Sequence, residues 1–255
     1  MKIYVINLER SKKRWESISR QLELVGFPYE RVNAIDGKLI SLDEYKKICV
    51  PLNNWLKMSW PQELTRTELA CYLSHMKCWE SLINSEENYA CILEDDVKLE
   101  KGFRKFVSNE LWIPQNIHVL QIHNALNIKK FYYNDSVNIE GETALIRPFW
   151  PYPFGCQGYI ISREAAQKAV RLSKNIIGPV DYFLFSPESR FYQQYPTYRL
   201  NPSVVNCTDF SSDIGLRDPK CTQKSPFYIR YAFPRLFNKI ILRFKIFFAK
   251  SCQVS

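Results

Sequence analysis

The chain has 255 residues, of which 46% are hydrophobic and 24% charged, as in ordinary globular proteins. Wholesale disorder and a fibrous architecture are therefore excluded, and no stretch reaches the roughly 18 apolar residues of a membrane-spanning helix. The first fifteen residues lack the apolar region and cleavage site of a secretory signal, so we expect a cytoplasmic protein. The eight cysteines contain no CxxC pair, which indicates reduced, mostly buried thiols rather than disulfides or a zinc site.

The net charge of +9 is concentrated at the C-terminal end. Residues 219–255 contain eight Lys or Arg and no acid, which leaves residues 1–218 nearly neutral. We therefore expect a folded domain over 1–218 that does not bind nucleic acid, followed by a basic tail over 219–255. Residues 235–250 place bulky apolar side chains at helical spacing beside Lys and Arg, which is typical of a helix on an anionic membrane surface. A helix docked on the domain is the alternative.

Strands and helices alternate from the N-terminus onward. The apolar run Lys2–Leu8 predicts a strand buried on both faces, and a helix is expected between Ser11 and Gly26. A second extended segment covers residues 27–35. Strand, helix and strand in this order predict a βαβ unit, and hence an α/β domain with a mainly parallel sheet flanked by helices. Residues 38–63 are interrupted by Pro and Asn and are expected to form a loop-rich insertion.

The segment 64–83 is predicted to be a long helix. Its expected core face carries Leu69, Leu73, Met76 and Ile83, and a second line beside this face carries Glu68, Tyr72, His75 and Trp79. A short apolar strand is expected at 89–93. Later strands are expected at 117–122, 143–147 and 158–161, with a helix from Ser162 to Leu172.

Three adjacent carboxylates, Glu94, Asp95 and Asp96, follow the strand at 89–93. They cannot all ionise in a dry environment without a compensating cation, and open α/β sheets bind ligands at the carboxyl ends of their strands. A hard divalent cation would neutralise the carboxylates and could bridge the phosphates of a nucleotide. A solvated acidic turn is the alternative. The sequence has no P-loop, GxGxxG or kinase signature, so a metal ion is the better candidate for holding a pyrophosphate.

Five sequence blocks, taken together and in order, resemble glycosyltransferase family 25. This is the lipooligosaccharide galactosyltransferase group of Gram-negative bacteria, to which the collagen galactosyltransferases are related. The blocks are IYVINLERSKKRW (3–15), VNAIDG (32–37), TELACYLSHMKCWESL (67–82), CILEDDV (91–97) and GYIISREAA (158–166). The resemblance extends over residues 1 to about 215 and implies a GT-A-like fold, a UDP-galactose donor and Mn²⁺ or Mg²⁺. It also implies an inverting reaction that forms a β-linked galactose, here a β-1,4 linkage.

The resemblance also implies roles for individual residues. Asp96 is the expected direct metal ligand within the family's DXD-like motif, and Asn206, Asp209 or Asp213 would supply a third ligand. Contacts to the sugar nucleotide are implied for a larger set: Asn7, Arg10, Arg14, Asp36, Glu68, Ser74, His75, Glu94 and Asp95. For His75, a core histidine satisfied within the helix packing is the alternative.

An inverting transfer needs a base that deprotonates the acceptor hydroxyl. Asp181 is the expected base, because it is a lone carboxylate among apolar residues, where desolvation raises the pKa. Its alternative role is to cap the helix that follows. Trp150, Tyr152 and Phe154 could stack on acceptor sugars or pack over the core.

The first functional hypothesis is a metal-dependent galactosyltransferase that extends a lipid-linked oligosaccharide at the inner face of the cytoplasmic membrane, with the tail as a peripheral anchor. A glucosyl- or N-acetylglucosaminyltransferase of the same fold is the second. The third is a glycoside hydrolase that pairs Asp95 or Asp96 with Asp181. The fourth is a non-enzymatic, membrane-recruited binding module.

Overall fold

A computed structural model describes the chain over residues 1–49, 64–124, 130–150, 155–176, 178–208, 246 and 249–253. Its helices are α1 (Lys12–Val25), α2 (Leu42–Ile48), α3 (Arg66–Ile83), α4 (Phe103–Val107), α5 (Arg163–Leu172), α6 (Val180–Phe185) and α7 (Arg190–Gln194). Its strands are β1 (Lys2–Asn7), β2 (Tyr29–Asn33), β3 (Tyr89–Glu94), β4 (Val97–Leu99), β5 (Val119–Gln121), β6 (Lys130–Glu140), β7 (Thr143–Trp150), β8 (Gly158–Ser162), β9 (Tyr198–Asn201), β10 (Val205–Cys207) and β11 (Lys250–Gln253).

Nine strands form one sheet in the order β11-β6-β7-β9-β5-β8-β3-β1-β2. β1 pairs in parallel with β2 and β3, so the predicted βαβ unit is confirmed. β5 and β9 are also parallel, whereas the remaining pairs of this sheet are antiparallel. The predicted α/β class with flanking helices is confirmed, and parallel pairing dominates where the carboxyl ends of β1 and β3 meet.

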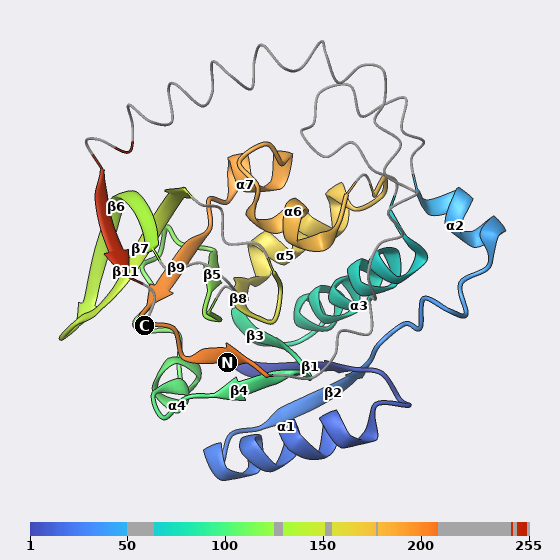
Figure 1. Ribbon diagram of the computed structural model, residues 1–255, viewed down its shortest axis with the longest axis horizontal. Helices are drawn as coiled ribbons and strands as arrows, with labels where there is room; N and C mark the ends of the chain where they lie inside the picture. The colour runs from blue at the N-terminus through green and yellow to red at the C-terminus, as the bar shows by residue number, and fades with distance from the viewer. Residues whose placement is uncertain are drawn as a thin grey trace.

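Helices cover both faces of the sheet (Figure 1). α1 and α4 lie on one face, where Ile18, Leu22 and Phe103 pack among the buried side chains of β1 and β3. α3, α5 and α6 lie on the other face, where Trp79 and Phe185 belong to a second buried cluster. Two hydrophobic layers therefore hold the sheet between them, and the strand ends that carry the acidic residues are fixed from both sides.

The predicted core face of α3 is wrong in part. Leu69 is fully buried, but Leu73, Met76 and Ile83 are only partly buried. The second line of side chains is buried instead: Tyr72, His75 and Trp79. The reason is that α3 contacts the sheet on one side and α5 and α6 on another. A helix held between two layers buries side chains on more than one side. The prediction assumed a single apolar face and therefore missed the second buried line.

The segment expected to be loop-rich contains α2, which is a correction. Ser41 caps this helix: its hydroxyl accepts from the backbone N–H of Glu44 at 3.2 Å, and the Glu44 carboxylate accepts from the Ser41 N–H at 2.9 Å. This reciprocal capping box follows the S-x-x-E pattern of residues 41–44, which is a local signal for a helix start within this segment. Residues 50–63 of the same segment lie outside the described part of the chain.

Part of the predicted basic tail belongs to the sheet. β11 pairs antiparallel with β6, with Ser251 opposite Tyr132, and forms one edge. The helix predicted over 235–250 lies outside the described residues, apart from residues 246, 249 and 250. Among the helices that the structure describes, none combines the length and apolarity that crossing a membrane requires.

Candidate active site

Several of the polar side chains predicted to bind a sugar nucleotide meet where β1 and β3 end. Ile6 of β1 lies opposite Glu94 of β3 in the parallel register, so Asn7 and Asp95 follow at the same edge of the sheet. The Asn7 amide donates to Asp95 Oδ2 at 2.5 Å, and Arg14 of α1 donates to Asp95 Oδ1 at 3.0 Å. Arg31 in turn donates to Asn7 Oδ1 at 2.5 Å. Both oxygens of Asp95 are therefore engaged within the protein.

Asp95 is an anchored carboxylate rather than an exposed one. It is 6% exposed, and burial raises its pKa, while the hydrogen bonds from Asn7 and Arg14 oppose that rise. A carboxylate held by an amide and a guanidinium has a fixed orientation. Asp95 therefore orients the acidic segment and links it to β1 and α1.

Asp96 has the opposite character, because one of its oxygens is unsatisfied. Its Oδ1 is buried and has no hydrogen-bond partner among the described residues, and its Oδ2 lies 3.9 Å from the Arg14 guanidinium. Burial, followed by the negative charge of Glu94, raises the pKa of Asp96 to about 7, with Arg14 acting in the opposite direction. A buried carboxylate oxygen without a donor is costly unless a cation or ligand completes it.

The residues present fit a hard divalent cation such as Mn²⁺ or Mg²⁺. Such ions take carboxylate oxygens as ligands, and the unsatisfied Oδ1 of Asp96 is one. The backbone carbonyl of Asp96 is held by Thr208, which donates its N–H at 2.9 Å and its hydroxyl at 2.8 Å. The segment from β10 to Thr208 is thus fixed against the acidic triplet. Asp209 follows Thr208 directly and Asp213 comes four residues later in the sequence, and both lie outside the described residues.

Asn206, the other candidate for a third ligand, is not brought to Asp96. Its amide donates to Glu100 Oε1 at 2.8 Å. The neighbouring Cys207 is closer to the triplet. Burial, followed by the negative charges of Asp96 and Glu94, raises the pKa of the Cys207 thiol to about 11. β10 pairs with β4 directly after the triplet, and only this long-range pairing places Cys207 and Thr208 at the site. No local sequence signal could have identified them.

Glu94 is joined to α3 through His75. The Glu94 Oε1 atom lies 3.3 Å from His75 Nε2, and His75 is fully buried. Cys71 lies one helical turn before His75, and its sulfur lies within 4.8 Å of a ring nitrogen of His75 and a carboxylate oxygen of Glu94. His75 therefore has partners within the packed interior, and its predicted contact to the sugar nucleotide stays a prediction.

Asp181 lies in the first turn of α6, where Pro179 occupies the N-cap position. Its Oδ1 accepts from the N–H of Tyr182 at 2.8 Å and its Oδ2 from the N–H of Gly155 at 3.3 Å. Burial is the main reason that its pKa is raised, and the charges of Glu94 and Glu68 add to the rise. The pKa is raised as expected. Pro179 and not Asp181 is the N-cap residue, but the Asp181 carboxylate does accept a first-turn N–H of α6.

Gly155 is a site residue that the sequence did not reveal. Its φ of 103° lies in the left-handed region, and a Cβ there would come within 2.4 Å of Gln157 Oε1. A glycine at this position therefore lets the backbone donate to Asp181. Residues 151–154, including the aromatic Tyr152 and Phe154, lie outside the described chain, and so does the side chain of Trp150.

Arg10 and Asp36 form a separate ion pair at the ends of β1 and β2. The second oxygen of Asp36 accepts from the N–H of Lys38 at 3.0 Å. The next residue, Gly37, lies against the start of α3, since a Cβ at this position would be 2.6 Å from the Thr67 Cα. The loop after β2 and the first turn of α3 are therefore in close backbone contact.

Glu68 and Ser74 have contacts within the fold. Glu68 completes a capping box with Thr65 at the start of α3. Ser74 accepts from the N–H of Ile35 at 2.9 Å and donates to the carbonyl of Ala70 at 2.7 Å, which ties the loop after β2 to α3. Their predicted contacts to a sugar nucleotide stay predictions.

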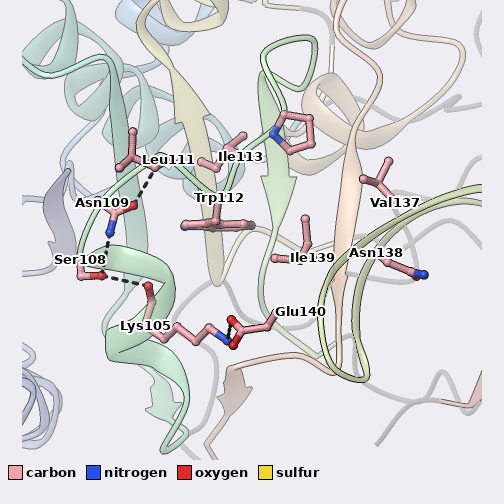
Figure 2. A pocket seen from close by; sticks show the side chains of 11 residues that line it. Lys105, Ser108, Asn109, Leu111, Trp112, Ile113, Val137, Asn138, Ile139 and Glu140 are labelled. Atoms are coloured by element: carbon pink, nitrogen blue, oxygen red, sulfur yellow. Dashed lines mark hydrogen bonds and ion pairs between the residues drawn. The ribbon is translucent and has the colours of Figure 1, made fainter.

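The described part of the chain also has a cavity of about 410 Å³, whose lining side chains are drawn in Figure 2. It is bounded by the segment after α4 and by β6, with Trp112 between them and an ion pair between Lys105 and Glu140. None of the predicted site residues lines it. The candidate site is therefore defined by the polar cluster at the ends of β1 and β3 and not by this cavity.

The comparisons of this chain with known proteins agree on one family. The family model described as glycosyltransferase family 25 (LPS biosynthesis protein) matches residues 1–184. Procollagen galactosyltransferase 2 of Homo sapiens is 30% identical over 189 residues, which cover 71% of this chain and 29% of that protein. The lipooligosaccharide biosynthesis protein lic2B of Haemophilus influenzae is 25% identical over 210 residues, which cover 79% of this chain and 74% of that protein.

A glycosyltransferase 25 family member of Anopheles gambiae is 29% identical over 186 residues, covering 71% of this chain and 31% of the relative. The chain thus spans about a third of the length of this relative and of the human one. The matched region contains β1, β3 and α3, and with them the acidic triplet. With the family model covering most of its length, the chain belongs to glycosyltransferase family 25.

Proposed function

We propose that the protein is an inverting, metal-dependent galactosyltransferase that moves galactose from UDP-galactose to a terminal sugar of a lipooligosaccharide, forming a β-1,4 linkage. The observation that carries the proposal is the buried Oδ1 of Asp96, just after β3, which has no hydrogen-bond partner among the described residues. A divalent cation bound there would stabilise the negative charge on the leaving diphosphate. The donor and acceptor are supported by relatives named as a procollagen galactosyltransferase and a lipooligosaccharide biosynthesis protein.

The residues around Asp96 have distinct tasks in this proposal. Asn7 and Arg14 keep Asp95 fixed and so hold the acidic segment in place. Arg10 and Asp36 lie at the ends of β1 and β2, where the nucleoside of the donor would lie. These groups bind and orient the sugar nucleotide, which is the larger part of what a transferase contributes to the reaction.

Asp181 is the proposed general base. Two of the lone-pair directions of its carboxylate are taken by backbone N–H groups, and two are left for the proton of the acceptor hydroxyl. Its raised pKa brings it nearer to neutral pH, where a base is most effective. Asp181 and Glu94 interact electrostatically, so the base lies near the acidic triplet.

The location at the inner face of the cytoplasmic membrane is also part of the proposal. It is supported by the charge pattern of residues 219–255, which contain eight cationic side chains and no anionic ones. A lipid-linked acceptor would bring the enzyme to the same surface.

The direct test is a transfer assay with radiolabelled UDP-galactose, UDP-glucose and UDP-N-acetylglucosamine on a lipooligosaccharide acceptor. We expect galactose to be transferred in the presence of Mn²⁺, the activity to disappear in EDTA, and the product to be a β-galactoside. Preferred transfer of glucose or N-acetylglucosamine would show that UDP-galactose is not the donor. Metal-independent release of free sugar would instead indicate the hydrolase that Asp181 and the triplet could form.

A further inference from the structure

Three buried side chains form a hydrogen-bonded series that ends at Glu94. The Trp79 indole donates to the Tyr159 hydroxyl oxygen at 2.8 Å. The Tyr159 hydroxyl lies 3.0 Å from His75 Nδ1, and His75 Nε2 lies 3.3 Å from Glu94 Oε1. Trp79, Tyr159 and His75 are all fully buried. The series therefore runs through the interior from α3 to β8, back to α3, and on to the end of β3.

The hydrogens in this series can be placed by counting donors and acceptors. The Trp79 indole only donates, so it occupies a lone pair of the Tyr159 oxygen. The Tyr159 hydroxyl has one hydrogen, and among the described residues His75 Nδ1 is the acceptor within reach. If Nδ1 carried a proton instead, two donors would point at Tyr159 and its own hydrogen would be buried without an acceptor. The count therefore assigns the acceptor role to Nδ1.

We propose that Trp79 and Tyr159 fix His75 as the neutral tautomer with its proton on Nε2, and that this N–H makes His75 a positioning residue for Glu94. The inference rests on the proposed function, in which Glu94 belongs to the site for the sugar nucleotide. The His75 N–H holds Oε1 of Glu94, and Oε2 has no hydrogen-bond partner among the described residues. The carboxylate is thus oriented with one oxygen held and the other available to the substrate.

The packing around the series favours a fixed geometry. The ring centroids of His75 and Tyr159 are 5.6 Å apart, and Tyr159 contacts Phe185 edge-on at 6.1 Å. Neither ring can turn without displacing buried neighbours, because interiors are close-packed. Orientation of Glu94 therefore depends on fully buried side chains behind it, which is the usual arrangement of a pre-organised site.

A zinc site is the competing interpretation of the same residues. Cys71, His75 and Glu94 offer sulfur, nitrogen and oxygen atoms within 4.8 Å of one another, which is a plausible ligand set for Zn²⁺. Zinc would bind Nε2 of His75 only after that atom lost its proton, and Nδ1 would then have to carry one. This exchange would leave the Tyr159 hydrogen without its acceptor. The hydrogen-bond count therefore favours the positioning role.

The tautomer can be read from ¹⁵N-labelled full-length protein by long-range ¹H–¹⁵N correlation of the imidazole rings. The chain has three histidines, so His118→Gln and His123→Gln variants assign the His75 signals. We expect a protonated Nε2 and an unprotonated, hydrogen-bonded Nδ1. In Tyr159→Phe the Nδ1 signal should shift, and kcat should fall roughly 10- to 100-fold with KM for the acceptor little changed.

Tyr72→Phe is the matched control. Tyr72 is also fully buried on this side of the sheet, but its hydroxyl bonds to Ser173 instead of His75. It should leave the His75 signals unchanged and kcat within about two-fold of wild type, since it removes a hydroxyl outside the series. A Tyr159→Phe variant that behaves like Tyr72→Phe would overturn the proposal.

Two further results would overturn the inference. One is a protonated Nδ1 on His75 in the wild type. The other is a Co²⁺ thiolate absorption band that is lost in Cys71→Ser and kept in Cys49→Ser, because it would show metal binding at Cys71 and His75. The NMR spectra need no enzymatic activity. A wild type that transfers no galactose would therefore refute the proposed function, while the His75 signals would still decide the tautomer.

Discussion

Replacing Asp96 with asparagine is expected to abolish sugar transfer and at the same time to stabilise the fold at pH 8. Transfer should fall on the order of 10³-fold in kcat/KM, because an amide oxygen is a poor substitute for a carboxylate in binding a divalent cation. Stability should rise because the buried, unsatisfied oxygen and the repulsion from Glu94 make an ionised Asp96 costly in the folded protein. Opposite effects on activity and stability are typical of a functional group held in a strained environment.

The pH dependence of this stabilisation follows from the raised pKa. The pKa of Asp96 rises from an ordinary value of 3.8 to about 7 in the folded chain. Between these values the folded state holds a proton that the unfolded state releases, so the free energy of unfolding of the wild type falls as pH rises through this window. Asparagine does not titrate. The advantage of Asp96→Asn should therefore be near zero at about pH 4 and reach about 4 kcal/mol above pH 7, without added divalent cation.

Thermal unfolding in EDTA at pH 5, 6, 7 and 8 measures this difference. Asp43→Asn is the matched control, because Asp43 is an exposed carboxylate in the first turn of α2, away from the site. It should show no gain that grows with pH. An Asp96→Asn variant whose Tm advantage is the same at pH 5 and pH 8 would contradict the burial argument, and one that still transfers galactose at the wild-type rate would contradict the site.

Replacing Asp181 with asparagine is expected to lower kcat by roughly 10²- to 10⁴-fold, the usual contribution of a general base. The KM for the sugar nucleotide should change little, because in the proposal Asp181 acts on the acceptor. The fold should survive: the amide oxygen of asparagine can still accept from the N–H of Tyr182, and only the weaker 3.3 Å bond from Gly155 is lost.

The pH profile separates a base from a merely structural carboxylate. Burial raises the pKa of Asp181, so the acid limb of kcat should lie at higher pH than for an ordinary aspartate. This limb should be missing in Asp181→Asn. Glu44→Gln serves as a control, because Glu44 is an exposed carboxylate in the capping box of α2 and is not part of the proposed site. Retention of kcat within ten-fold in Asp181→Asn would mean that another group is the base.

The elements that the sequence predicted well are those specified by local signals. The strand at β1, the helix α1 with its left-handed Gly26 and the strand at β3 follow from apolar runs and end signals within a few residues. The acidic triplet was likewise found because it directly follows a buried strand. Local patterns are sufficient when an element has one buried surface or is buried throughout.

The remaining features depend on contacts between distant segments. The buried side of α3 could not be predicted because α5 and α6, about a hundred residues later, cover it. The strand β11 depends on its pairing with β6, which no local pattern reveals. The partners of each carboxylate are also non-local: Asp95 meets Asn7 of β1 and Arg14 of α1, and Asp181 meets Gly155.

The central claim is that Asp96 holds a divalent cation that binds the diphosphate of a sugar nucleotide, and titration calorimetry of UDP tests it most directly. The wild type should bind UDP at least ten-fold more tightly in Mn²⁺ than in EDTA, and Asp96→Asn should lose this difference while remaining folded. Equal UDP binding with and without Mn²⁺ in the wild type, or an undiminished Mn²⁺ effect in Asp96→Asn, would contradict the account.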